Sequence, residues 1–167
     1  MQNKPEISIV IPLFNENESL IELNETIQKV LNEYNVNYEV IFIDDGSTDK
    51  SWASIKEIAM KSKNIFGISF SKNYGKSQAL HAGFEMAKGN YVFTLDADLQ
   101  DSPYEIPLMH EILLKENLDL ISGWKKKRFD SILFKNLPSK IFNWAARKVS
   151  GIKIHDFNCG IKGYKKE

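Results

Sequence analysis

The sequence predicts one α/β domain in which a mainly parallel sheet is flanked by helices. Short runs rich in β-branched and aromatic residues alternate along the chain with segments whose apolar residues recur at helical spacing. Most of these runs are apolar at consecutive positions, as expected of strands that are buried on both faces of a sheet. The chain has 167 residues, of which 43% are hydrophobic, so it can enclose a single hydrophobic core.

Five strands and four helices are predicted in alternation. The strands are expected at residues 7–11, 39–43, 66–70, 91–95 and 118–122. The apolar positions that predict the four helices are, in chain order, Leu20, Leu23, Ile27, Val30, Leu31 and Tyr34, then Trp52, Ile55, Ile58 and Ala59, then Ala79, Leu80, Gly83, Met86 and Ala87, and finally Ile106, Met109 and Ile112.

The ends of some elements can also be predicted. Ser102 is expected to cap the fourth helix and Pro103 to occupy its first turn. Ser47 or Thr48 is a candidate cap for the second helix. A further apparent strand ends before Gly163, with no closing element after it, which suggests that the sequence is cut from a longer protein.

Charge is distributed unevenly, although 22 basic residues balance 22 acidic ones. Residues 1–120 hold 10 Lys and Arg against 19 Asp and Glu, a net of −9, whereas residues 121–167 hold 12 against 3, a net of +9. We therefore expect residues 1–167 to form one domain with two tasks, the basic part meeting an anion or an anionic membrane. A solvated basic tail would give the same pattern.

Cys159 is the only cysteine, so no intrachain disulfide can form, which favours a reducing compartment. The first residues lack the apolar core of a signal peptide, and no apolar run approaches the roughly 20 residues needed to span a bilayer. The sequence therefore predicts a soluble or peripheral chain.

Polar and mostly acidic groups follow four of the predicted strands. They occupy residues 12–16, 44–49, 71–76 and 96–101. Ligands of parallel α/β sheets bind beyond the carboxyl ends of the strands. We therefore expect these four segments to form one site.

Asp96, Asp98 and Gln100 are candidate metal ligands. Alternate positions of an extended chain point the same way. Two carboxylates and an amide oxygen suit Mg²⁺ or Mn²⁺, with the remaining positions left to water and phosphate. A D-x-D sequence is common in turns, but its place at the end of a buried strand favours the metal site.

Asp44 and Asp45 have two interpretations. With Gly46 they could be a simple turn. Adjacent carboxylates repel, however, and are tolerated best beside donors such as ribose hydroxyls, a base N–H or a cation, which favours a binding role. Lys76, after Gly75 at the start of a helix, is either a surface lysine or a partner for a diphosphate.

Residues 9–16, 44–49 and 96–100 resemble the successive signatures of family 2 glycosyltransferases, which have the Rossmann-like GT-A fold. The resemblance extends from about Glu6 to Lys166. Leu99 with Gln100, and residues 122–128 and 155–160, resemble the polyprenyl-phosphate hexose synthases in particular. This resemblance implies a metal-dependent, inverting transfer of a hexose from a nucleotide-diphosphate sugar to a polyprenyl phosphate.

The resemblance also implies residue roles. The nucleoside would be held by Pro12, Phe14, Glu16, Ile43 and Asp45. Asp96 and Ala97 would lie beside the ribose and diphosphate, and Lys76 is expected near the same group. Asp98 and Gln100, with Asp96, would bind Mg²⁺ or Mn²⁺. Donor or acceptor phosphates would be faced by Lys125, Arg128, Ser139 and Lys162. Asp156 is a candidate base or acceptor-side ligand, expected to orient the acceptor rather than to deprotonate it. The residues expected to contribute to catalysis are Asp96, Asp98 and Arg128.

Two positions depart from the family pattern. The family often has tyrosine at Phe14 and arginine at Lys125, and a lysine cannot reproduce a bidentate guanidinium contact. Residues 1–120 would be the nucleotide-sugar and metal-binding part, and residues 121–167 the acceptor or membrane-facing part. The basic part also carries interleaved aromatic residues, which are typical either of a membrane-surface element or of a core-packed helix with a basic face.

The implied partners are a UDP- or GDP-linked sugar, a polyprenyl-phosphate acceptor and a membrane surface, without nucleic acid, and a homo-oligomer stays open. The implied location is the cytoplasmic side of the membrane, either peripheral or anchored by a C-terminal region. Three alternatives remain: transfer to a sugar hydroxyl, nucleotidyl transfer, and a non-catalytic nucleotide-binding α/β module. Nucleotidyl transfer would ordinarily need a Gly-rich phosphate loop, which residues 12–16 do not form.

Overall fold

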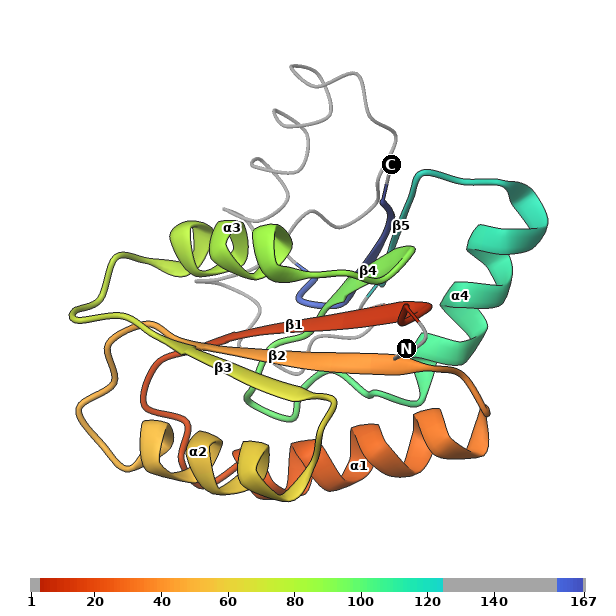
Figure 1. Cartoon of the computed structure of the whole chain (residues 1–167). Helices are drawn as coiled ribbons and strands as arrows, with labels where there is room; N and C mark the ends of the chain where they lie inside the picture. The colour runs from red at the N-terminus through yellow and green to blue at the C-terminus, as the bar shows by residue number, and fades with distance from the viewer. Residues whose placement is uncertain (1–3, 125–158, 167) are drawn as a thin grey trace, which may run out of the picture.

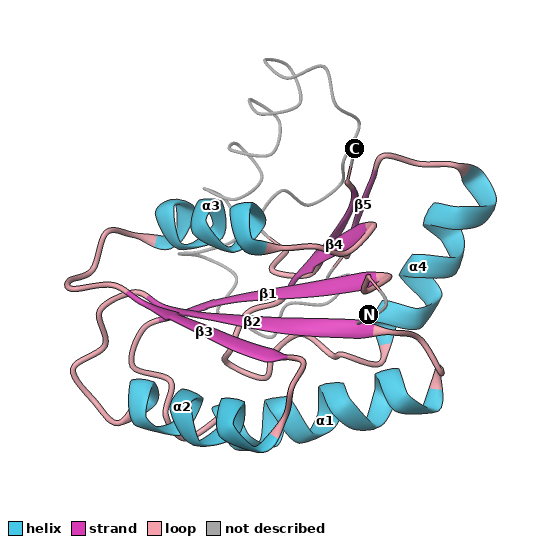
Figure 2. Ribbon diagram, viewed as in Figure 1, coloured by secondary structure: helices cyan, strands magenta, loops and turns pink. Residues whose placement is uncertain are grey.

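The computed structural model describes residues 4–124 and 159–166, which form one six-stranded sheet with helices on both faces (Figures 1 and 2). The strands are β1 (Ile7–Leu13), β2 (Tyr38–Asp44), β3 (Ile65–Ser69), β4 (Tyr91–Thr94), β5 (Leu120–Ser122) and β6 (Lys162–Lys165). The helices are α1 (Leu20–Glu33), α2 (Ser51–Lys61), α3 (Lys76–Met86) and α4 (Glu105–Glu116).

The sheet is mainly parallel, as predicted. Its strand order is β3-β2-β1-β4-β6-β5. The pairs β1–β2, β1–β4 and β2–β3 are parallel, whereas β6 lies antiparallel between β4 and β5. The expectation that the last strand ends before Gly163 is wrong, because Gly163 lies inside β6. A Cβ at this position would come within 2.6 Å of the Phe93 ring, so the glycine allows the two strands to pack closely there.

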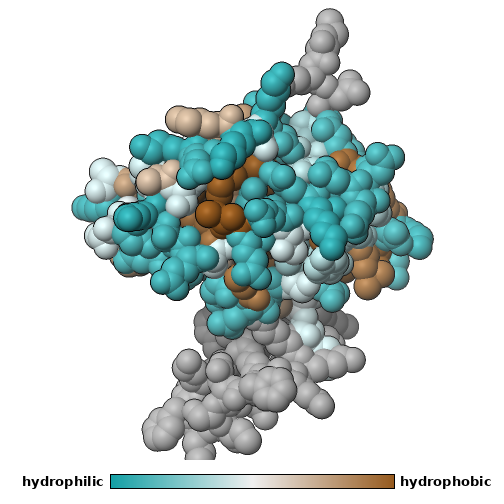
Figure 3. All heavy atoms as spheres, turned by 90° about the horizontal axis from the view of Figure 1, so that it is seen from below, coloured by the Kyte–Doolittle hydropathy of each residue, from teal (hydrophilic) through white to brown (hydrophobic). Residues whose placement is uncertain are grey.

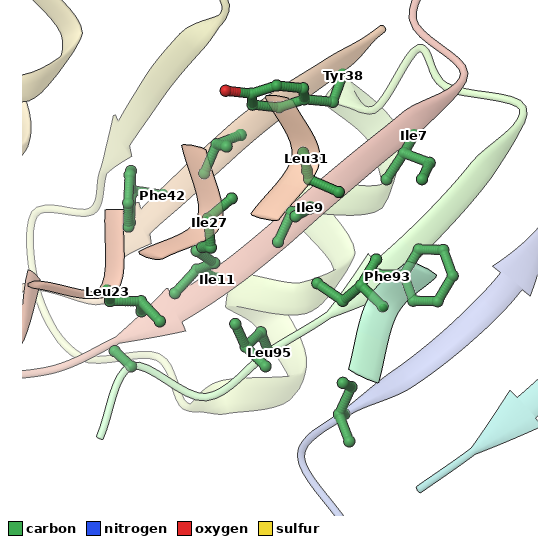
Figure 4. Packing of buried hydrophobic residues seen from close by; sticks show 14 of the residues in the cluster. Ile7, Ile9, Ile11, Leu23, Ile27, Leu31, Tyr38, Phe42, Phe93 and Leu95 are labelled. Atoms are coloured by element: carbon green, nitrogen blue, oxygen red, sulfur yellow. The ribbon is translucent and has the colours of Figure 1, made fainter. Parts of the chain in front are cut away.

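The larger core lies between the sheet and α1, α2 and α4. Ile7, Ile9 and Ile11 occupy alternate positions of β1 and point to this face, where they meet apolar residues of α1 (Figure 4). Each of the three is fully buried, which contributes about 1.5–3 kcal/mol per side chain. The opposite sides of α1 and α2 are largely hydrophilic (Figure 3).

The smaller core lies between the other face and α3. Val10 and Ile43 project to this side, and Gly83 of α3 packs directly on them. A Cβ at Gly83 would collide with Val10 and lie 2.9 Å from Ile43 Cδ1. The glycine therefore fixes α3 close to the sheet, and with it the first residue of that helix, Lys76.

The predicted helix caps are wrong. Tyr104 is the N-cap of α4 and Lys50 that of α2, and neither makes a side-chain capping bond. Ser102 instead begins the turn that precedes α4. Its hydroxyl accepts the Tyr104 N–H at 3.4 Å, and its backbone carbonyl accepts the Glu105 N–H at 3.2 Å. Ser47 uses its hydroxyl for a contact with another loop, described below. None of the helices in the described part of the chain combines the length and the hydrophobicity that a membrane-spanning helix requires.

Candidate functional site

The loops that follow β1 and β2 are joined by side-chain hydrogen bonds. Asn15 Oδ1 accepts the Thr48 N–H at 2.8 Å and the Asp49 N–H at 3.3 Å, and the Asn15 N–H donates to Ser47 Oγ at 2.9 Å. Asn15 adopts a left-handed conformation with φ 59°, which asparagine tolerates better than most residues. Asn15 therefore fixes the loop that follows β2 against the loop that follows β1.

Asp44 and Asp45 are both almost fully buried, yet they serve different neighbours. Asp44 accepts hydrogen bonds from the Ser47 N–H at 3.0 Å and from the Ser69 hydroxyl at 3.2 Å. Asp45 accepts the backbone N–H groups of Tyr74 at 2.7 Å and Gly75 at 2.8 Å. The protein's own donors thus satisfy both carboxylates, and Asp45 anchors the loop between β3 and α3.

Lys76 and Asp96 form an ion pair across the site. The Lys76 ammonium lies 2.5 Å from Asp96 Oδ1, and the two side chains are 55% and 29% exposed. Lys76 begins α3, whereas Asp96 follows β4. The contact therefore joins the start of α3 to the loop after β4.

The D-x-D segment is a turn and is not extended, so the argument from alternating positions is wrong for Asp98 and Gln100. β4 ends at Thr94, and Leu99 has φ 59°, an unusual conformation for a bulky side chain. Asp98 Oδ1 accepts the Gln100 N–H at 3.1 Å. Such local strain is frequent at binding sites.

Gly160, which lies in the described segment 159–166, packs against the Asp96 carboxylate. A Cβ at Gly160 would lie 2.5 Å from Asp96 Oδ2 and would also collide with Asp101. The Thr94 hydroxyl donates to the Gly160 carbonyl at 2.9 Å and so fixes the glycine beside the end of β4. The sequence did not predict this role, since Gly160 lies 66 positions after Thr94, which fixes it in place.

A cavity of about 300 Å³ opens where these loops meet. Its lining residues are Pro12, Leu13, Phe14, Glu16, Asp45, Asn73, Gly75, Lys76, Ala79, Asp96, Ala97 and Asp98. These include every residue predicted to bind the nucleotide sugar except Ile43, which is fully buried in the core under α3. Gln100 is exposed and does not line the cavity.

Four lining residues, Leu13, Asn73, Gly75 and Ala79, were not among the predicted site residues. Leu13, Asn73 and Gly75 lie in two of the four segments that follow predicted strands, so their position in the sequence could have identified them. Ala79 lies one helical turn after Lys76, and its small side chain leaves space in the cavity. A larger depression of about 940 Å³ lies at the amino ends of the strands and includes none of the predicted site residues.

Of the predicted acceptor-side residues, Lys162 is the one within the described part of the chain. Lys125, Arg128, Ser139 and Asp156 lie outside the described residues. Lys162 is half-buried at the start of β6, where it pairs in register with Thr94 and Ser122, and it does not line the cavity.

The donor set at this cavity fits a hard divalent cation. Asp96 and Asp98 both line it, and carboxylate oxygens are the preferred ligands of Mg²⁺ and Mn²⁺. Within residues 4–124 and 159–166, no three His, Cys, Asp or Glu side chains converge as a complete metal cage. The remaining coordination positions would be left for water and ligand oxygens.

The family model for glycosyl transferase family 2 matches residues 8–167. The chain is 34% identical to a dodecaprenyl-phosphate galacturonate synthase from Rhizobium johnstonii, covering 96% of this chain and 48% of that protein. It is 38% identical to an undecaprenyl-phosphate 4-deoxy-4-formamido-L-arabinose transferase from Aeromonas hydrophila, covering 96% and 49%. The chain thus spans about half the length of the curated relatives it matches.

Two solved structures share the fold. A mannosyltransferase from Pyrobaculum calidifontis, in complex with GDP-Man and Mn²⁺, superposes with a TM-score of 0.69 at 18% identity, covering 98% of this chain and 45% of that one. A glucosyl-3-phosphoglycerate synthase from Mycobacterium tuberculosis, in complex with UDP, gives a TM-score of 0.71 at 23% identity, covering 96% and 57%.

Proposed function

Since the chain belongs to glycosyl transferase family 2, we propose that residues 1–167 are the catalytic domain of an enzyme that transfers a sugar from a nucleotide diphosphate to a polyprenyl phosphate. The observation that carries the proposal is the cavity at the carboxyl ends of the strands. It combines two carboxylates, Asp96 and Asp98, with the ammonium of Lys76. These groups suit a ligand that consists of a divalent cation and a diphosphate.

The names of both relatives support the acceptor class. Each names a polyprenyl phosphate, whereas the sugars are galacturonate in one and 4-deoxy-4-formamido-L-arabinose in the other. We therefore propose the acceptor as a class and leave the sugar to experiment. The solved structures with GDP-Man and with UDP are consistent with a nucleotide-linked donor.

The donor would enter the cavity with its diphosphate near Lys76 and its base and ribose toward the segment that contains Phe14 and Glu16. Asp96 and Asp98 would hold a divalent metal, which supplies neutralisation of the charge that develops on the leaving nucleoside diphosphate. Asp45 would act indirectly. It binds the backbone N–H groups of Tyr74 and Gly75 and so holds the loop between β3 and α3, which lines one side of the cavity.

The acceptor phosphate needs little activation by a base. Its second pKa is about 6, so it is anionic near neutral pH. One of its oxygens would attack the anomeric carbon opposite the diphosphate, so that a new C–O bond forms while the bond to the diphosphate breaks and the configuration inverts. Transfer to a sugar hydroxyl would instead require a base to accept the hydroxyl proton.

The basic part of the chain is proposed to receive the acceptor at a membrane surface. Its described residues meet the site where Gly160 packs on Asp96, and they are joined to one another where Gly123 donates its N–H to the Ile161 carbonyl at 3.0 Å. Lysine and arginine in residues 121–167 would attract an anionic lipid headgroup. The cytoplasmic side of the membrane is part of this proposal.

Calorimetric titration tests the donor site. UDP, GDP and CDP are titrated into the protein with Mn²⁺ and then with EDTA, and the series is repeated with Asp98→Ala and with the exposed control Asp119→Ala. We expect one nucleotide to bind only with metal, and Asp98→Ala alone to abolish that binding. Folded protein that binds none of the three nucleotides would contradict the proposal.

The acceptor is tested by incubating labelled donor with undecaprenyl phosphate in detergent and, separately, with the lipid alcohol undecaprenol. We expect label to enter the lipid only when the phosphate is present. Equal labelling of the alcohol would favour a hydroxyl acceptor instead.

A further inference from the structure

We propose that Lys76 is a built-in counterion for Asp96 that makes metal binding and nucleotide binding depend on each other. The proposal rests on the proposed function and adds a regulatory property to the same site. In the absence of ligands the ammonium holds the carboxylate. When a metal binds Asp96, the ammonium is released and is free to bind the diphosphate.

The first argument is the contact itself. Lys76 Nζ lies 2.5 Å from Asp96 Oδ1, close enough that a cation coordinated by the same oxygen would displace the ammonium. The other oxygen, Oδ2, packs against Gly160. The two oxygens of Asp96 therefore have different neighbours, and Oδ1 is the one for which lysine and metal compete.

The second argument is that the backbone which carries Lys76 is held in place. Asp45 binds the N–H groups of Tyr74 and Gly75, the two residues immediately before Lys76. Gly83 holds α3 against the sheet at Val10. The backbone around Lys76 is thus fixed, whereas its side chain is 55% exposed and can move when a ligand enters the cavity.

The third argument is charge. Two cations at one carboxylate oxygen repel each other, so a metal alone must overcome the loss of the Lys76–Asp96 pair. A diphosphate in the cavity gives the displaced ammonium a new anionic partner, which lowers the cost of metal binding. Because such coupling is reciprocal, the metal must strengthen nucleotide binding by the same factor.

The test measures Mn²⁺ affinity by the electron paramagnetic resonance signal of free Mn²⁺, with and without a saturating nucleoside diphosphate chosen from the titrations above. The proteins are the wild type, Lys76→Met and Lys72→Met. Lys72 lies on the same loop, is exposed and stacks over Tyr74, outside the cavity, so it controls for the loss of one nearby positive charge.

In the wild type we expect the nucleotide to tighten Mn²⁺ binding at least about fivefold. In Lys76→Met we expect Mn²⁺ alone to bind at least about fivefold tighter than in the wild type, and the effect of the nucleotide on Mn²⁺ binding to be smaller by a similar factor, because only direct coordination by the diphosphate then remains. Lys72→Met is expected to behave as the wild type. Circular dichroism verifies that each variant is folded.

The outcomes separate the two proposals. If the wild type shows metal-dependent nucleotide binding and Lys76→Met keeps the same coupling, the counterion role is wrong and the proposed function stands. An equal gain in Mn²⁺ affinity in Lys72→Met would also overturn it, because the effect would then be general electrostatics. Absence of any metal-dependent nucleotide binding in the wild type would overturn both proposals.

Discussion

Gly160 packs against the carboxylate of Asp96, so closely that a methyl group at position 160 would lie 2.5 Å from Asp96 Oδ2. The contact joins the loop after β4 to the segment that leads into β6. The position of a proposed metal ligand therefore depends on a residue that has no functional group of its own.

Replacing Gly160 by alanine is expected to weaken metal-dependent nucleotide binding at least about tenfold, equivalent to about 1.4 kcal/mol. The added methyl must push away Asp96 and Asp101, and overpacking of this kind also costs about 1–3 kcal/mol of stability. Calorimetric titration measures the first effect and urea unfolding the second.

Gly163→Ala is the matched control, because its methyl would collide with Phe93 inside the sheet and not with the cavity. We expect it to lower stability by a similar amount while nucleotide affinity stays close to that of the wild type. If the two variants lose affinity equally, the contact between Gly160 and Asp96 has no specific role.

Asp45→Asn and Asp44→Asn form an informative pair of neighbouring substitutions. At Asp45, the amide can offer only one oxygen to the N–H groups of Tyr74 and Gly75, so one of them loses its partner, at about 1–3 kcal/mol. Asp44→Asn should lose less stability in urea unfolding, because its amide oxygen can still accept the Ser47 N–H and its amide N–H can donate to the Ser69 hydroxyl. Nucleotide affinity should fall only in Asp45→Asn, because only Asp45 holds the loop at the cavity, and an equal fall in both would contradict this assignment.

Asn15 is expected to stabilise the domain through two effects that substitution can separate. Asn15→Ala removes the hydrogen bonds to Thr48 and Asp49 and places alanine at φ 59°, where a Cβ costs about 1–2 kcal/mol. Asn15→Gly removes the hydrogen bonds but tolerates this conformation. In urea unfolding, the alanine variant should therefore be the less stable of the two, and the reverse order would show that backbone conformation is unimportant there.

His110 should make the domain sensitive to mild acid. Burial lowers the pKa of His110 below its ordinary value of 6.5, against the opposing effect of Glu6 and Glu111. The unfolded chain therefore binds more protons than the folded one below pH 6.5, so stability falls as pH decreases through that value. One such group changes the free energy of unfolding by at most about 1.4 kcal/mol per pH unit.

The measurement is urea unfolding at pH 7.0 and pH 5.5 for the wild type and His110→Gln. Glutamine can keep a hydrogen bond to the Tyr34 hydroxyl, which lies 3.2 Å from His110 Nδ1, but it does not titrate. We expect the variant to lose less stability than the wild type on acidification. Equal losses would place the acid sensitivity elsewhere.

The fold was predictable because it follows from local patterns. The consecutive apolar residues of β1 and β2 are buried at every position, and the spacing from Leu20 to Leu31 matches the buried face of α1. The helix starts were less predictable, because Ser47 is used by Asn15 in another loop. That competition depends on residues 32 positions apart, which no local pattern reveals.

The site was predictable at the level of segments and less so at the level of atoms. The segments that follow the parallel strands meet at one edge of the sheet, and this brings Asp45, Lys76 and Asp96 into one cavity, as expected. The sequence could not show that backbone amides satisfy Asp45, or that Leu99 turns the chain so that Gln100 lies away from the cavity. Both outcomes are set by tertiary packing.

The place of β6 between β4 and β5 has a consequence for biosynthesis. β1 to β4 precede it in the chain and can pair while residues 162–165 are still inside the ribosome, and N-terminal parts generally fold first during synthesis. Until β6 arrives, β4 is an edge strand with unpaired backbone groups, which is a site for aggregation. The same late segment brings Gly160 to Asp96, so the edge of β4 is covered and the proposed metal ligand is packed in place at nearly the same moment.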